Sequence, residues 1–128
     1  MRSINTLDLL NKVAQIIFDK KGMNILALDL RAISTISDYA IIAEGAVDRH
    51  VIAIAHAIIE ELEKIGVKAF RVEGMQTGDW VVIDYAEFMV HLFMPGIREK
   101  YLLEELWRKG KLVELKIELS PQSNMQNK

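Results

Sequence analysis

The feature that most restricts the fold is the stretch Asp79–Met94, which reads DWVVIDYAEFMVHLFM. It contains two apolar runs separated only by DYAE, a pattern that predicts an antiparallel hairpin with Tyr85 and Ala86 in a two-residue turn. Pro95 and Gly96 follow and end the second strand.

A two-residue turn also predicts which side chains share a face of this hairpin. It places Trp80 opposite His91 and Val82 opposite Met89, and because side chains alternate along a strand, these four share one face. The other face carries only apolar residues, which are Val81, Ile83, Phe88 and Val90. That second face is ordinary core. The first face, with an indole, an imidazole and a thioether, is either core covered by a helix or a protein-binding surface.

The remaining apolar patterns place this hairpin in a mixed α/β domain. Helical spacing predicts helices over Thr6–Lys21, Asp48–Ile65 and Ile97–Gly110. Alternation predicts strands over Asn24–Leu30, Asp38–Gly45 and Val67–Gly74, with a short additional strand after Lys111. The strand–helix–strand order makes the second and third of these strands parallel. We therefore expect a mixed sheet of about five strands flanked by helices, one domain over residues 1–119 and a disordered tail over 120–128.

Composition narrows the classes of function. The chain has 128 residues, 51% of them hydrophobic, which is enough for a single core. Its net charge of -2 disfavours general binding to nucleic-acid phosphate. It has no cysteine, which excludes disulfides, thiolate metal sites and cysteine catalysis. No run approaches the roughly 18 apolar residues of a membrane span, and the N-terminus lacks a signal-like apolar region. We expect a cytoplasmic protein without membrane contact.

The polar motifs do not predict catalysis. The segment GAVDRH has a glycine between a strand and a helix, but it matches neither phosphate-binding pattern, and Asp48 would place a carboxylate where a phosphate would bind. His50 and His56 lie about 120° apart around a helix, so they do not form a metal pair. No D-x-D pair occurs to hold Mg²⁺. We expect no enzyme activity, no cofactor and no metal, and Asp48 as N-cap with Arg49 and His50 as a surface contact at the helix start.

Four motifs in series resemble those of the ribosomal silencing factor family RsfS, also called Iojap. They are DYAIIAEG followed by DRHVIAIA, then RVEG, DWVVIDYAEFMVHLF and REKYLLEELW. The resemblance runs from Leu7 to Trp107 and implies a fold distantly similar to nucleotidyltransferases without their catalytic acids. It also implies a non-enzymatic factor that binds the large ribosomal subunit through universal ribosomal protein L-fourteen. By occupying that face, the factor would block joining of the small subunit and repress translation.

The same resemblance assigns the ribosomal contact to the tryptophan and the sheet surface beside it. Trp80 is then the anchor, and Val82, Met89 and His91 surround it. The residues expected at the charged rim are Arg71, Glu73 and Arg98, and Tyr101 is a further expected contact residue. Because the overall charge is weak, we expect a protein target with little or no direct contact to RNA.

The chain departs from the family pattern in two short segments, and after Trp107 it is longer than the family core and largely unmatched. Ala46 and Val47 replace the hydroxyl residues of the family's GTS, so a helix cap there is in doubt. Ala86 replaces the glycine of the family's DYGD turn, and if this position needs a positive φ, alanine costs about 1 kcal/mol. Two alternatives to a ribosomal factor stay open: a homo-oligomeric module, for example a homodimer, whose hairpin face pairs with itself, and a nucleotide-processing enzyme.

Overall fold

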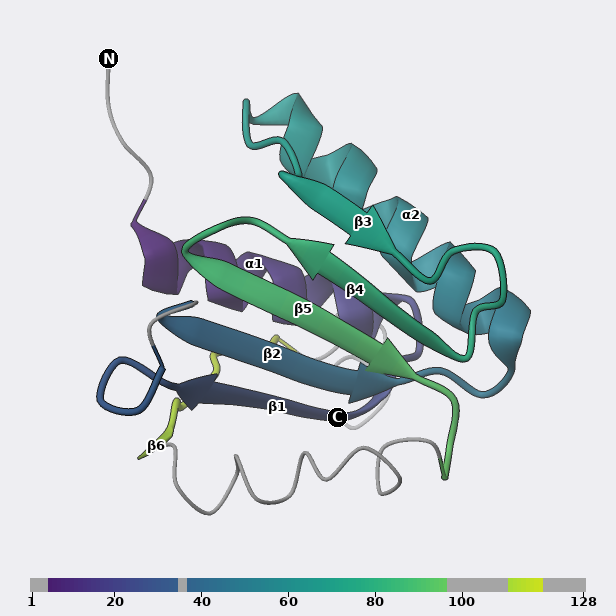
Figure 1. Cartoon of the computed structure of the whole chain (residues 1–128), viewed down its shortest axis with the longest axis horizontal. Coiled ribbons are helices and arrows are strands. Elements are labelled where there is room, and N and C mark those ends of the chain that lie inside the picture. The colour runs from purple at the N-terminus through teal and green to yellow at the C-terminus, as the bar shows by residue number, and fades with distance from the viewer. Residues whose placement is uncertain (1–4, 35–36, 97–110, 119–128) are drawn as a thin grey trace, which may run out of the picture.

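A computed structural model of the chain describes residues 5–34, 37–96 and 111–118 (Figure 1). Within them, six strands form one sheet in the order β3-β4-β5-β2-β1-β6. The strands are β1 (Met23–Asp29), β2 (Tyr39–Glu44), β3 (Arg71–Glu73), β4 (Trp80–Asp84), β5 (Phe88–Phe93) and β6 (Lys111–Leu112). β2 and β5 run parallel, whereas all other neighbours run antiparallel. The predicted mixed sheet is confirmed, and the two-residue β6 is its sixth strand.

The order of the strands differs from the simplest arrangement that the sequence suggests. β2 and β3 run in the same direction, as the strand–helix–strand order predicts, but they are not neighbours. The hairpin of β4 and β5 lies between them, with β5 paired to β2 and β4 paired to β3. The hairpin therefore separates β2 from β3, and β3 is the edge strand next to β4.

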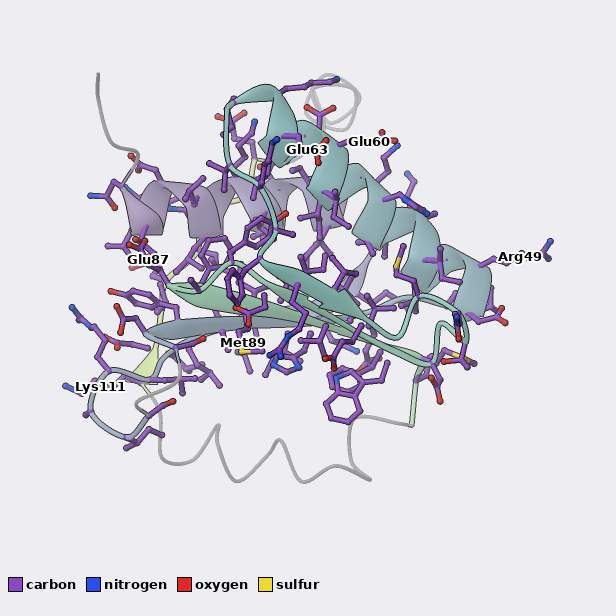
Figure 2. The ribbon with its side chains drawn as sticks, turned by 45° about the horizontal axis from the view of Figure 1, so that its top comes forward. Arg49, Glu60, Glu63, Glu87, Met89 and Lys111 are labelled. Atoms are coloured by element: carbon purple, nitrogen blue, oxygen red, sulfur yellow. The ribbon has the colours of Figure 1, made fainter. Side chains whose placement is uncertain are left out.

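Two helices, α1 (Thr6–Asp19) and α2 (Asp48–Lys64), lie on the same side of the sheet (Figures 1 and 2). The main core fills the space between them and the sheet. It includes the four hairpin residues that the sequence predicts as core, each at most 1% exposed: Val81, Ile83, Phe88 and Val90. A smaller buried cluster lies on the opposite side of the sheet and contains Leu28, Leu30, Ala40, Ile42 and Phe93.

The ends of α1 show how local sequence sets its length. The side-chain oxygen of Asn5 accepts a hydrogen bond from the N–H of Leu7 at 2.7 Å and so caps the first turn. After the helix, Lys21 rather than Gly22 adopts the left-handed conformation, with φ 69°. Gly22 is required for space, because a Cβ atom there would collide with the side chain of Ile17.

Residues 111–118 form an extended strap along β1 and α1. β6 pairs with β1, and the N–H of Val113 then donates to the carbonyl of Ala27 at 2.9 Å. Val113 and Leu115 are half-buried against the main core. The short strand predicted after Lys111 therefore exists, but it ends at Leu112.

Side-chain amides of α1 hold the far end of this strap. The side-chain oxygen of Asn11 accepts from the N–H of Lys116 at 2.7 Å. The amide of Gln15 accepts from the N–H of Glu118 at 2.6 Å and donates to the carbonyl of Glu118 at 2.9 Å. Beyond the two paired residues of β6, these three hydrogen bonds hold the strap in place of pairing with a strand.

Candidate functional site

The hairpin of β4 and β5 has a longer turn than the sequence predicts. Trp80 lies opposite Phe93 and Val82 lies opposite His91, so the strands are offset by two residues from the predicted pairing. The loop between them is three residues long, Tyr85–Glu87. The predicted two-residue turn is therefore wrong.

Ala86 accounts for the change. It has φ 73°, in the left-handed region that glycine adopts most readily. Its N–H donates to Oδ1 of Asp84 at 2.8 Å, and its carbonyl accepts from the hydroxyl of Ser37 at 3.3 Å. The turn thus needs a positive φ at this position, and alanine there costs about 1 kcal/mol relative to glycine.

An offset of two residues leaves the faces of the hairpin unchanged, because side chains alternate with a period of two. Trp80, Val82, Met89 and His91 therefore share one face, as the sequence predicts, and all four are half-buried. Figure 2 shows Met89 on the lower side of the sheet, opposite the two helices. This side of β3, β4 and β5 is called the outer face below.

β3 extends the outer face with two charged residues. Arg71 lies opposite Asp84, and Glu73 lies opposite Val82. Since residues opposite one another in a sheet share a face, Arg71 and Glu73 join the four hairpin residues in one continuous surface. The structure therefore brings together six of the predicted contact residues. The other two, Arg98 and Tyr101, lie outside the described residues, as do the predicted helix over Ile97–Gly110 and the predicted tail over 120–128.

An aromatic cluster forms the centre of the outer face. The indole N–H of Trp80 donates to Nδ1 of His91 at 3.2 Å. Phe93 stacks beside both rings, with its centroid 5.3 Å from that of Trp80 and 6.2 Å from that of His91. Burial lowers the pKa of His91 to about 4, so its ring is neutral near pH 7. The result is an uncharged aromatic platform whose rings hold one another in place.

Charged side chains border this platform on the side of β3. Nη2 of Arg71 lies 3.3 Å from Oδ2 of Asp84, and Nε of Arg71 lies 3.6 Å from Oε2 of Glu73. The side chains of Arg71 and Glu73 are 59% and 64% exposed, so these contacts contribute little to stability. They do place both signs of charge at the rim of the aromatic centre.

Two residues of the outer face, Asp84 and Phe93, are not among the predicted contact residues. Asp84 accepts both from Arg71 and from the turn, and Phe93 stacks with the rings of Trp80 and His91. The signal that identifies them is the same alternation: Asp84 is two residues beyond Val82, and Phe93 is two residues beyond His91.

The start of α2 differs from its prediction. The N-cap is Val47 rather than Asp48, and its side chain makes no capping hydrogen bond. Asp48 is instead the first helical residue, and its Oδ1 accepts from the N–H of Arg49 at 2.7 Å. The doubt raised by the missing hydroxyl is therefore justified, because α2 begins without a side-chain cap.

His50 links the segment before α2 to the end of α1. Its Nδ1 accepts from the N–H of Ala46 at 2.8 Å, and its Nε2 donates to the carbonyl of Lys20 at 2.7 Å. Both ring nitrogens of His50 are thus hydrogen-bonded within the chain, while its surface contact stays a prediction. Arg49 does project outward from the start of α2 (Figure 2), on the helix side of the sheet and not on the outer face.

Residues 5–34, 37–96 and 111–118 hold neither a metal-ion cluster nor a membrane-spanning helix. Histidine and acidic side chains do not gather there in groups of three that would hold a metal ion. No helix of this part of the chain is long and apolar enough to cross a membrane. A groove of about 340 Å³ runs between α1 and α2, and its polar lining carries both signs of charge: Lys12, Asp19, Lys20, Glu60 and Glu61.

Comparison with known proteins identifies the family. The profile described as "Ribosomal silencing factor during starvation" matches residues 3–128. The chain belongs to this family. The ribosomal silencing factor RsfS of Haemophilus influenzae is 41% identical over 87 residues, which cover 68% of this chain and 85% of that protein. The RsfS of Bacillus subtilis is 37% identical over 97 residues, which cover 76% of this chain and 82% of that protein.

The fold of this ribosomal silencing factor family member is also found in a solved structure. A crystal structure of a protein from Chromobacterium violaceum matches with a TM-score of 0.79 at 26% identity, over 92% of this chain and 98% of that one. The resemblance seen in the sequence motifs is confirmed. The family profile extends beyond Trp107, the end of the resemblance by motifs, and includes the strap.

Proposed function

We propose that the chain binds the large ribosomal subunit through its outer face, with ribosomal protein L-fourteen as the contact. Bound there, it blocks joining of the small subunit and represses translation. Membership of a family described as silencing ribosomes during starvation supports the ribosomal target. The observation that supports this surface is the contrast within one hairpin, where Trp80 and His91 are half-buried while Val81 and Val90 are fully buried.

The proposed mechanism is physical exclusion and needs no chemistry. A protein interface of standard size covers roughly 800 Å² on each partner, which is enough to prevent another body from docking on the same surface. Trp80 is the anchor because large aromatic side chains dominate the energy of most protein interfaces. Met89 and Val82 fill the space around it, and Met89 adapts its shape to the partner.

The charges of the outer face favour a protein partner over RNA. Among the described residues of this face the arginine is Arg71, and it lies against the carboxylates of Asp84 and Glu73, so little of its positive charge is left for phosphate groups. The same pairing supports a non-enzymatic role, because Asp84 is occupied by Arg71 and by the turn N–H of Ala86.

Co-sedimentation with purified large subunits tests this proposal. We expect Trp80→Ala to lower the affinity at least tenfold, since it removes the anchor. Arg71→Glu, at a side chain that is 59% exposed, reverses a rim charge without disturbing the core and is expected to weaken binding several-fold. Ile65→Ala is the matched control, because Ile65 is 42% exposed at the end of α2 on the helix side. Wild-type affinity of both outer-face variants would refute the assignment of this surface.

Two further measurements separate the finer statements. Purified ribosomal protein L-fourteen should compete with large subunits for the chain, and a lack of competition would place the contact on another component. Excess chain should lower the fraction of joined ribosomes in a sucrose gradient, whereas Trp80→Ala should not. If the outer face instead pairs with a second copy of the chain, light scattering will report a dimer that Trp80→Ala disrupts.

A further inference from the structure

The contact between Trp80 and His91 determines which nitrogen of His91 carries the ring proton. An indole N–H can donate a hydrogen bond but cannot accept one. It lies 3.2 Å from Nδ1 of His91, so Nδ1 must be the acceptor. The neutral imidazole therefore carries its proton on Nε2, and its tautomer is fixed by its neighbour.

The N–H on Nε2 is a hydrogen-bond donor without a partner in the described part of the chain. The side chains on either side of His91 are Ile42 on β2 and Val82 on β4, and neither can accept a hydrogen bond. A partner that covered the outer face and offered no acceptor here would leave this donor buried and unpaired, which is costly. A well-matched partner must therefore supply an acceptor at this point.

The charges around His91 indicate what kind of acceptor it is. The outer face carries two acidic residues, Asp84 and Glu73, toward one edge. Arg71 lies against both of these acids, so two negative charges face one positive charge there. A carboxylate from the partner would be repelled by this surplus of negative charge, whereas a neutral carbonyl would not.

We propose that the Nε2–H of His91 is the specificity-determining donor of the outer face and binds a neutral backbone carbonyl oxygen of the partner protein. The Trp80 indole then has two roles: it packs against the partner and holds the imidazole in the donating tautomer. This inference rests on the proposed function, since it assumes that the outer face is the surface that binds the ribosome.

Two substitutions of His91 test the proposal, because each one keeps the hydrogen-bonding group of only one of the two ring nitrogens. In His91→Gln the amide nitrogen takes the place of Nε2 and keeps the outward donor. In His91→Asn the amide oxygen takes the place of Nδ1, which keeps the acceptor for Trp80 but loses the outward donor. We expect co-sedimentation with large subunits to give His91→Gln an affinity within about threefold of wild type and His91→Asn an affinity about tenfold weaker. His56→Gln, at an exposed histidine of α2, is the matched control.

The outcomes separate this inference from the proposed function. If Trp80→Ala loses binding while His91→Asn binds as tightly as His91→Gln, the outer face is the site but the donor is not used, and the inference is overturned. If Trp80→Ala also binds like wild type, the outer face is not the site and both proposals fail. Thermal midpoints of all variants identify any that lose affinity through unfolding.

Two measurements on the unmodified chain complete the test. Long-range proton–nitrogen NMR spectra of the free protein should show the His91 proton on Nε2, and a proton on Nδ1 would overturn the inference. The affinity of wild type should also change with pH between 6 and 8 no more than that of His91→Gln. A wild-type affinity that alone rises as the pH falls would indicate a carboxylate partner, because such a partner raises the pKa of the imidazole, and would refute the neutral carbonyl.

Discussion

Replacement of Ala86 by glycine is expected to stabilise the fold, although glycine usually destabilises folded proteins. Ala86 occupies the hairpin turn with φ 73° and is exposed to solvent, so its methyl group contributes little packing. The two hydrogen bonds that hold this residue use its main-chain N–H and carbonyl, and glycine keeps both. The substitution therefore removes backbone strain and leaves the contacts of the turn intact.

The size of the effect follows from two opposing contributions. A left-handed conformation costs an L-residue with a Cβ atom about 1–2 kcal/mol. Glycine loses more backbone entropy on folding, which offsets roughly 0.5–1 kcal/mol of that gain. The net stabilisation is about 1 kcal/mol. With an unfolding entropy of about 2.1 cal/mol/K for each of 128 residues, the melting temperature should rise by about 4 °C.

Calorimetry or circular dichroism during heating measures this shift, and a second Ala→Gly change serves as the control. Ala53 is exposed in the middle of α2, where glycine is unfavourable by about 1 kcal/mol. Ala53→Gly should therefore lower the melting temperature by about as much as Ala86→Gly raises it. A decrease for Ala86→Gly, or shifts of the same sign for both variants, would contradict the assignment of strain to the turn.

Three further predictions concern single side chains. Val47→Ser should stabilise the chain by about 1 kcal/mol in urea unfolding, because it supplies the missing cap of α2; no gain would mean that the Asp48 carboxylate, which accepts from the N–H of Arg49, already satisfies this end. Tyr85→Phe should leave stability unchanged or raise it by up to about 1 kcal/mol, since the buried hydroxyl has no partner among the described residues; a loss would refute this. Burial lowers the pKa of His91 to about 4 from 6.5, so its contribution to stability is complete above pH 6.5 and is lost as the pH falls toward 4. Unfolding measured across this window should show wild type losing about 3 kcal/mol more than His91→Gln, and equal losses would contradict a buried neutral imidazole.

The helices α1 and α2 and the faces of the hairpin could be predicted from sequence because they depend on apolar residues that repeat at short intervals along the chain. Apolar residues at helical spacing located α1 and α2 to within two residues at each end. Alternation assigns Trp80 and His91 to one face of the hairpin. The predicted register is wrong by two residues, and an offset of two leaves each side chain on the same face. A one-residue error would have placed both side chains in the main core.

The details that could not be predicted depend on contacts between distant segments or on a single backbone angle. The register of the hairpin is set by the positive φ of Ala86. A glycine at this position would have indicated a positive φ, whereas an alanine does not. His50 bonds the carbonyl of Lys20, thirty residues earlier, and no local pattern indicates that pairing. The position of the hairpin between β2 and β3 likewise arises from which apolar surfaces fit together.

The strap along α1 has a consequence for how this part of the chain can vary. Asn11 and Gln15 hold it through main-chain atoms, which every residue except proline provides in full. Only Val113 and Leu115 contribute side chains to the core. We therefore expect the outward-facing positions of the strap to accept almost any amino acid except proline. The contacts with α1 fix the extended conformation of the strap but leave most of the strap's sequence unconstrained.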